Sequence, residues 1–231
     1  MRWFVTGDTH GDWSRIWNWL DKMEFTRDES ISVIILGDAG LFWRNDRKDA
    51  NEMIKYHEEK YNVHIYFLDG NHENFKILKQ YKPSITGIVN ISNHIHYLPR
   101  GFNGYLALSK RLARIAVCGG ADSIDKFRRT EGLSWWKDET ITDEDVDKIP
   151  EDDFDYVFTH CCPSSVFYEN KSCLATLSCI SEEDISHESE DQLEKLKNKI
   201  SYKKWFFGHY HVDRELDNKH RAVLNDFVEL F

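Results

Sequence analysis

The sequence repeats one pattern five times: a short apolar run, typical of a buried strand, ends directly in a cluster of polar residues. The runs and clusters are Trp3–Thr6 before GDTHGD, Ile31–Leu36 before GDAG, His64–Leu68 before DGNHE, Tyr156–Thr159 before HCCP, and Trp205–Phe207 before GHYH. In open α/β sheets, ligand-binding residues lie at the carboxyl ends of the strands. We therefore expect an α/β protein whose polar clusters form a site at its strand ends.

Segments between the first three runs have the character of helices. The apolar residues Trp13, Ile16, Trp17 and Leu20 are spaced for one helical face. A charged segment from about Asp46 to Lys60 separates the second run from the third. This alternation predicts βαβ units.

The second half of the chain predicts more strands and one further helix. His94–Leu98, Gly104–Ser109 and Leu112–Val117 have the pattern of three consecutive strands, which we expect to form a second, more antiparallel sheet. The segment Ser181–Ile200 has one apolar helical face, and its charges belong to a solvated face. The acidic stretch Asp138–Asp153 lacks the glycine and terminal glutamate of a calcium loop, so we expect a surface excursion.

The length of 231 residues permits one large domain or two small ones. No repeat, low-complexity tract or linker rich in Pro, Gly or Ser is visible, and only four prolines occur. We therefore predict a single domain spanning residues 1–231.

Composition limits the partners and the compartment. No stretch is apolar enough to span a membrane, and the opening MRWFVTGDTHGD leaves no room for a signal peptide. Five cysteines without CxxC spacing indicate reduced thiols, so we expect a cytoplasmic protein. The formal net charge of -10 would repel duplex nucleic acid but not a small phosphate ester bound at metal ions. The sequence does not predict an oligomeric state.

The polar clusters contain seven side chains that could bind metal through oxygen or imidazole nitrogen. These residues are Asp8, His10, Asp38, Asn71, His160, His209 and His211. Without a thiolate, such donors suit Mn²⁺, with Fe or Zn²⁺ as alternatives, better than Ca²⁺ or Mg²⁺. Seven ligands are too many for one ion with an open position but fill two ions if one carboxylate bridges them. Two divalent ions roughly 3.5–4 Å apart could hold a phosphoryl group and activate a water molecule near neutral pH.

These motifs resemble the calcineurin-like metallophosphoesterase family, whose pattern is Asp-x-His, Gly-Asp, Gly-Asn-His-Asp/Glu, a later His, and Gly-His-x-His. All five blocks are present in order from Asp8 to His211. The resemblance implies a four-layer α/β/β/α sandwich with two mixed β-sheets flanked by helices, and a dinuclear metal site at the strand ends. It also implies specific ligands: Asp8, His10 and His211 for one metal, Asn71, His160 and His209 for the other, with Asp38 as the bridge.

The resemblance further implies that His72, next to Asn71, is the general acid, while Asn71 and Asp38 also contact the reacting groups. Glu73 is expected to support the turn. The opening motifs are similar to the protein Ser/Thr phosphatase branch, but that branch continues its second block as Gly-Asp-x-x-Asp-Arg-Gly. Here Leu41 occupies the position of the acid that would pair with the catalytic histidine. The sequence does not show which carboxylate, if any, orients His72.

The segment Cys118–Glu139 is similar to small bacterial and phage-encoded members of the wider family. Arg128 or Arg129 could bind a non-bridging phosphate oxygen as a bidentate clamp, or both could form a surface pair. Trp135 and Trp136 could stack on a nucleobase, although adjacent indoles more often have one anchored in the core.

We therefore expect a phosphoester hydrolase that uses a hydroxide activated by two metal ions and a histidine general acid, without a covalent enzyme intermediate. The expected substrate is a small phosphorylated or nucleotide-like compound, and the sequence leaves phosphomonoesterase and phosphodiesterase activity open. The alternatives are a protein Ser/Thr phosphatase and a non-catalytic binding scaffold with the same fold. Retention of His72 and all seven ligand candidates argues against the scaffold.

Overall fold

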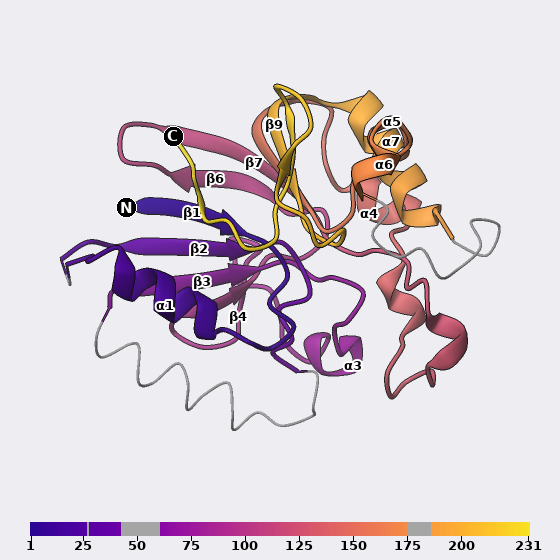
Figure 1. The fold of residues 1–231 in the computed structure, drawn as a ribbon, viewed down its shortest axis with the longest axis horizontal. Helices are drawn as coiled ribbons and strands as arrows, with labels where there is room; N and C mark the ends of the chain where they lie inside the picture. Colours follow the sequence, from indigo (N-terminus) through magenta and orange to yellow (C-terminus); the bar gives the residue numbers. More distant parts are fainter. Residues whose placement is uncertain (27, 43–60, 175–185) are drawn as a thin grey trace.

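The structure is a computed structural model, and it describes residues 1–26, 28–42, 61–174 and 186–231 (Figure 1). Within these residues the strands form two mixed sheets of six strands, with helices flanking both. The predicted α/β/β/α sandwich is therefore confirmed. The charged segment from about Asp46 to Lys60, expected to be helical, lies outside the described residues.

The first sheet has the order β12-β1-β2-β3-β5-β4. Its strands are β1 (Arg2–Thr6), β2 (Ile31–Ile35), β3 (Val63–Phe67), β4 (Val89–Asn90), β5 (Ile95–Tyr97) and β12 (Val228–Glu229). The four central strands are parallel, and the two edge strands pair antiparallel. Thr6 lies opposite Ile35, which in turn lies opposite Phe67. The first three predicted strands therefore end at the same level, and the loops after them meet.

The second sheet has the order β10-β11-β9-β8-β7-β6. Its strands are β6 (Asn103–Ala107), β7 (Leu112–Cys118), β8 (Asp153–Thr159), β9 (Ser201–Phe207), β10 (Arg214–Glu215) and β11 (His220–Ala222). Here too the four central strands are parallel, and the outer two are antiparallel. Thr159 lies opposite both Cys118 and Phe207, so β7, β8 and β9 also end together.

The expected grouping of the three consecutive strands was wrong. Strand β5 pairs in parallel with β3 and belongs to the first sheet, whereas β6 and β7 belong to the second. The second sheet is also mainly parallel rather than mainly antiparallel. The residue pattern of β5 indicated a strand correctly, but sheet membership depends on pairing with residues about thirty positions earlier, such as Ile65 with Ile95.

Three layers of apolar packing hold the sandwich together. Alternation along β1 sends Phe4 toward the outer face of the first sheet, and Trp3 and Val5 toward the layer between the sheets. Helix α1 (Ser14–Lys22) covers that outer face with Ile16, Trp17 and Leu20, while Trp13 just before it is also buried. The predicted apolar helix face is therefore confirmed. Each such side chain contributes roughly 1.5–3 kcal/mol when fully buried.

The remaining helices are short, apart from α7 on the outer face of the second sheet. They are α3 (Phe75–Leu78), η1 (Lys126–Arg128), η2 (Lys137–Glu139), α4 (Asp143–Asp147), α5 (Ser164–Glu169), α6 (Lys171–Leu174) and α7 (Glu188–Lys199). Acidic residues lie in the first turn of α7 and lysines in the last, as the helix dipole favours. Its buried Leu193 and Leu196, followed by buried Ile200, confirm the predicted apolar face; residues 181–185 of that prediction lie outside the described part.

The acidic stretch Asp138–Asp153 is not a plain surface excursion. It contains α4, which begins with a capping box between Thr142 and Asp145. It also buries Glu139, Ile141 and Ile149. Apolar residues between the charges anchor this segment beside the second sheet.

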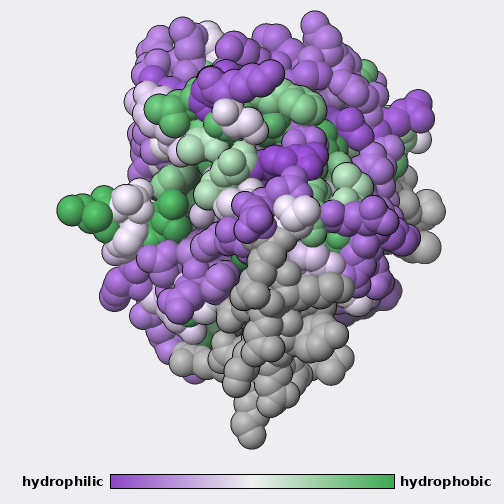
Figure 2. Space-filling view, turned by 90° about the vertical axis from the view of Figure 1, so that its left-hand side faces the viewer, coloured by the Kyte–Doolittle hydropathy of each residue, from purple (hydrophilic) through white to green (hydrophobic). Residues whose placement is uncertain are grey.

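The parallel strands end on the right-hand side of Figure 1, and Figure 2 views the molecule from the opposite side. Hydrophilic side chains cover most of that face, with apolar side chains in small groups between them. Across the described residues, no helix combines the length and the hydrophobicity needed to cross a bilayer.

Candidate metal centre

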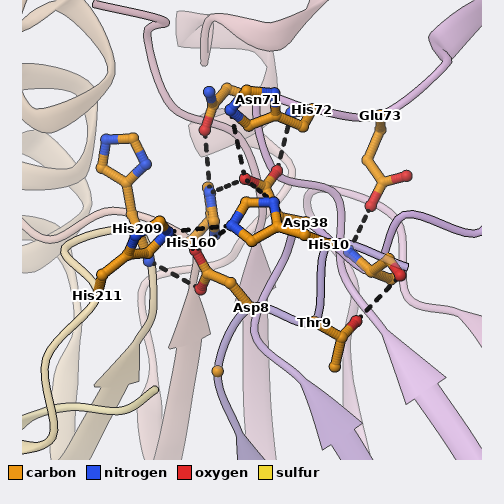
Figure 3. A network of polar contacts seen from close by, with 12 residues as sticks. Asp8, Thr9, His10, Asp38, Asn71, His72, Glu73, His160, His209 and His211 are labelled. Carbon is orange, nitrogen blue, oxygen red and sulfur yellow. Dashed lines mark hydrogen bonds and ion pairs between the residues drawn. The ribbon is translucent and has the colours of Figure 1, made fainter. Parts of the chain in front are cut away.

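The loops after five parallel strands carry the seven predicted ligands, which Figure 3 shows close together. We call these residues the ligand cluster. They are Asp8 and His10 after β1, Asp38 after β2, Asn71 after β3, His160 after β8, and His209 and His211 after β9.

One group of donor atoms is formed by Asp8, His10 and His211. The Nε2 atoms of His10 and His211 are 3.0 Å apart, and Nε2 of His211 lies 3.2 Å from Oδ2 of Asp8. Asp8 is buried, whereas both histidines are partly open to solvent. This group therefore offers two imidazoles and one carboxylate at the mouth of the cluster.

A second group lies deeper and is formed by Asp8, Asp38 and His160, all buried. Nε2 of His160 lies 3.5 Å from Oδ2 of Asp38 and 3.1 Å from Oδ1 of Asn71. Oδ2 of Asp38 also lies 3.7 Å from Nδ1 of His10. The two donor groups share Asp8, and Asp38 contacts histidines of both. Either carboxylate therefore lies where a bridging ligand between two ions would lie.

His209 lies beside the second group, with its ring centroid 5.0 Å from that of His160. Its backbone N–H donates to Oδ1 of Asp8 at 3.0 Å. Burial lowers the pKa of His209 to about 3, which keeps the ring neutral, as a metal ligand requires. Tyr210 points the other way, and its hydroxyl donates to Glu190 at 3.2 Å.

The backbone of the ligand cluster is strained. Five non-glycine residues in the described part have positive φ, and four of them are predicted ligands. These four are His10 (46°), Asp38 (48°), His209 (65°) and His211 (51°). A left-handed conformation costs on the order of 1–3 kcal/mol for such residues and is concentrated at functional sites. The strained backbone therefore lowers local stability and directs these side chains toward one another.

Two glycines allow the loops to pack closely against the carboxylates. A Cβ atom at Gly70 would lie 2.0 Å from Oδ1 of Asp38, and one at Gly208 would lie 2.2 Å from Oδ1 of Asp8. Any side chain at either position would displace a carboxylate. The glycines in DGNHE and GHYH are therefore required by the geometry of the cluster.

The buried carboxylates create a strong demand for positive charge. Burial alone would raise the pKa of Asp38, but His160 and its neighbours hold this pKa far below its usual range. Conversely, burial opposes protonation of His160, yet Asp38 and Asp8 raise its pKa to about 9. A proton on His160 thus balances part of the negative charge. A divalent cation would meet the same demand more fully, so the donor set fits divalent metal ions well.

Comparison with protein families agrees with this geometry. The family model for calcineurin-like phosphoesterase matches residues 1–213 of the 231. The chain belongs to the calcineurin-like phosphoesterase family. A search of curated proteins finds no significant match. The family assignment makes the chain a hydrolase of phosphoesters that depends on divalent metal ions.

In this phosphoesterase, His72 lies at the edge of the ligand cluster. Its backbone N–H donates to Oδ1 of Asp38 at 2.8 Å, and its ring Nε2 lies 3.9 Å from Oδ2 of the same residue. The guanidinium of Arg129 lies against the ring, with Nη1 2.8 Å from Nδ1 and Nη2 3.1 Å from Nε2. Burial, opposed by Asp38 and reinforced by Arg129, lowers the pKa of His72 to about 4. Thus Arg129 provides a cationic neighbour that sequence reasoning did not anticipate.

The two predicted phosphate-binding arginines diverge. Arg129 is half-buried, and its Nε donates to Oδ1 of Asp125 at 2.8 Å while its other end contacts His72. Arg128 is exposed, with its guanidinium 5.1 Å from the centroid of the Phe127 ring. Arg129, which directly follows η1, therefore lies beside the ligand cluster, whereas Arg128 at the end of η1 faces solvent.

A cavity of about 270 Å³ opens beside His72 and Arg129. Its lining residues are His72, Asp125, Arg129, Leu133, Ser134 and Trp136. Trp135 and Trp136 are both half-buried, and Trp136 reaches this cavity. The cavity therefore combines apolar and charged walls next to the predicted catalytic histidine.

Sequence reasoning missed two buried residues in the segment after β7, of which one contacts the ligand cluster and the other supports that contact. Ser123 accepts a hydrogen bond from Nδ2 of Asn71 at 3.0 Å, and Glu139 accepts from Ser123. The signal was the position of Ser123 shortly after a strand end. Glu73 was expected to support the turn, and its Oε1 accepts from the backbone N–H of Ala39 at 2.8 Å.

Proposed function

We propose that this phosphoesterase holds two divalent ions in the ligand cluster and hydrolyses a small phosphorylated or nucleotide-like compound. The observation that carries the proposal is the pair of donor groups that share Asp8, with each group's donor atoms within 4.8 Å of one another. Two ions bound there would activate a water molecule and neutralise charge on the phosphoryl group.

We assign Asp8, His10 and His211 to one ion and Asn71, His160 and His209 to the other. Asp38 is proposed as the bridge because its Oδ2 faces histidines of both groups. Its Oδ1 accepts a hydrogen bond from the backbone N–H of His72, which ties the bridging carboxylate to the catalytic loop.

His72 and Arg129 are proposed to act on the substrate. A phosphate entering from the cavity would meet the guanidinium of Arg129, which can donate two hydrogen bonds to non-bridging oxygens. Without substrate, the imidazole of His72 contacts Arg129, and its pKa is lowered to about 4. Negative charge on a bound substrate would favour the protonated form of His72. The imidazole could then donate a proton to the departing alkoxide.

Mn²⁺ is the proposed ion, with Fe or Zn²⁺ as alternatives, because the donors are oxygen and imidazole nitrogen without thiolate. The cysteines next to His160 do not change this donor set. Burial raises the pKa of Cys161 and of Cys162 well above the usual range, so both remain thiols.

A small substrate is supported by the cavity of about 270 Å³, which could hold one small leaving group. The resemblance to protein Ser/Thr phosphatases is weakened at position 41. Leu41 is buried among the apolar residues under the first sheet, where the other branch would place an acid beside the histidine.

The test is hydrolysis of p-nitrophenyl phosphate and bis-p-nitrophenyl phosphate by metal-stripped protein resupplied with Mn²⁺. We expect activity that requires the metal and falls by on the order of 10³-fold in Asp38→Asn, because the bridging charge supplies several kcal/mol in the transition state. The preferred ester separates monoesterase from diesterase. Metal-bound protein that is silent on both esters would contradict the small-substrate proposal and favour the scaffold.

A further inference from the structure

The amide of Asn71 has one donor and one acceptor end, and only one orientation presents oxygen to the metal ligands. In the structure Oδ1 lies 3.1 Å from Nε2 of His160, and Nδ2 donates to Oγ of Ser123 at 3.0 Å. An amide turned by half a rotation would place its NH₂ group where an ion would bind. Some neighbour must therefore fix the orientation.

Ser123 can fix it only if its own hydroxyl proton is held elsewhere. Its Oγ donates to Oε2 of Glu139 at 2.9 Å, and its backbone N–H donates to Oε1 of Glu139 at 2.6 Å. When Glu139 is ionised it has no proton to donate, so the hydroxyl proton of Ser123 then points to Glu139. The lone pairs of Oγ are then left for the NH₂ group of Asn71.

These groups are shielded from water, which makes the direction of each hydrogen bond matter. Asn71, Ser123 and Glu139 are all buried, with Glu139 only 1% exposed. In such surroundings an unsatisfied polar group costs about 1–3 kcal/mol. The chain of hydrogen bonds therefore has one favourable direction, from Asn71 through Ser123 to Glu139.

Arg100 holds the backbone that carries Glu139. It donates to the carbonyl oxygens of Asp138, Glu139 and Thr140 at 2.8–2.9 Å, and its Nε donates to Oδ2 of Asp69 at 2.7 Å. Asp69 lies two residues before Asn71. One arginine thus fixes both ends of the hydrogen-bonded path.

We propose that Glu139, acting through Ser123, is a positioning residue that keeps the amide oxygen of Asn71 turned toward the metal ligands. The inference rests on the proposed function, because it takes Asn71 as a metal ligand. A neutral glutamine at position 139 could donate to Oγ of Ser123 instead and release the hydroxyl proton toward Asn71. Both orientations of the Asn71 amide would then be allowed.

The experiment measures Mn²⁺ binding to metal-stripped full-length protein by titration calorimetry. We expect Ser123→Ala and Glu139→Gln each to weaken one of two Mn²⁺ sites by about 10- to 100-fold, as loss of an outer partner typically does, and to leave the other site unchanged. Asp138→Asn is the matched control. It removes a neighbouring carboxylate whose side chain pairs with Lys79 at the surface, and it should bind as the wild type does.

A double-mutant cycle separates positioning from general support of the fold. In an Asn71→Asp background the ligand has oxygen on both sides, so Ser123→Ala should no longer weaken Mn²⁺ binding. Equal losses in both backgrounds, or unchanged affinity in Ser123→Ala and Glu139→Gln, would overturn the assignment alone. A wild-type protein that binds no Mn²⁺ would overturn the proposed function together with this assignment.

Discussion

Within the described residues, histidine rings meet in two regions: the ligand cluster at the strand ends, and a second group of His64, His94 and His96, which we call the His64 cluster. Both have imidazole nitrogens in close contact. His10 and His211 approach to 3.0 Å, while His64 and His96 approach to 3.1 Å. The rings of the His64 cluster are stacked, with centroids 5.0 and 5.4 Å apart.

The two clusters differ in what surrounds the rings. Asp8 and Asp38 lie among the histidines of the ligand cluster and raise the pKa of His160 to about 9 despite its burial. In the His64 cluster, burial and neighbouring histidines lower the pKa of His96 to about 4, and its Nδ1 contacts the amide oxygen of Asn90 at 2.8 Å. Histidine rings therefore approach each other to a similar distance in both clusters. The two clusters differ because, in the described part of the chain, only the ligand cluster has buried carboxylates among its histidines.

The comparison predicts that Mn²⁺ stabilises the protein through the ligand cluster alone. At about 100 times its dissociation constant, an ion that binds only the folded state adds about 2.7 kcal/mol, or a rise in Tm of roughly 5–10 °C for a chain of this size. We expect Asp8→Asn to abolish most of this rise and His64→Ala to retain it. Thermal unfolding with and without Mn²⁺ measures both. A rise that disappears in His64→Ala instead would show that the comparison is wrong.

His72 is a third kind of histidine, since the cation of Arg129 lies against its ring. If Arg129 binds the substrate phosphate, Arg129→Ala should lower kcat/KM by about 10- to 100-fold, the value of one or two charge-assisted hydrogen bonds. The matched control is Arg128→Ala, because Arg128 is exposed and lies over Phe127. We expect it to change kcat/KM little. Equal effects of the two substitutions would remove Arg129 from the substrate site.

Most of the fold could be predicted because the strands that end in polar clusters are short and strongly apolar. The ligands of each sheet followed from the same pattern, since parallel strands of one sheet end together, but the meeting of the strand ends of the two sheets did not follow from it. The partner of β5 could not be predicted, because the residue pattern of a strand does not specify which sheet it joins. The burial of Glu139 was missed because its acidic neighbours at Asp138 and Asp143 give the segment the composition of a surface loop.

The contacts around the metal ligands were harder to predict than the ligands themselves. Ser123 and Asn71 are 52 residues apart, and Glu139 reaches Ser123 across a loop with little regular structure. Neither contact follows from the regular residue spacing of a helix or a strand. The choice between Arg128 and Arg129 depends on the direction of one turn of 3₁₀ helix, which composition does not determine.

The smallest expected effect is the pH dependence that the His64 cluster gives to stability. Because the folded state lowers the pKa of His96 from 6.5 to about 4, the neutral ring contributes stability above pH 6.5. That contribution is lost as the pH falls from 6.5 toward 4. The ring is half-exposed, so after screening by solvent we expect a loss on the order of 1 kcal/mol, or about 2–4 °C in Tm.

Thermal unfolding of metal-free protein at several pH values between 6.5 and 4 measures this loss. Asn at position 96 does not titrate, so the His96→Asn variant should lose less stability than the wild type over this interval. For His160 in the ligand cluster the sign is opposite. The raised pKa of His160 gives stability below pH 6.5 that is lost as the pH rises toward about 9, and His160→Asn should weaken this alkaline loss only. If His96→Asn and the wild type lose the same stability in acid, the two clusters do not differ as their surroundings indicate.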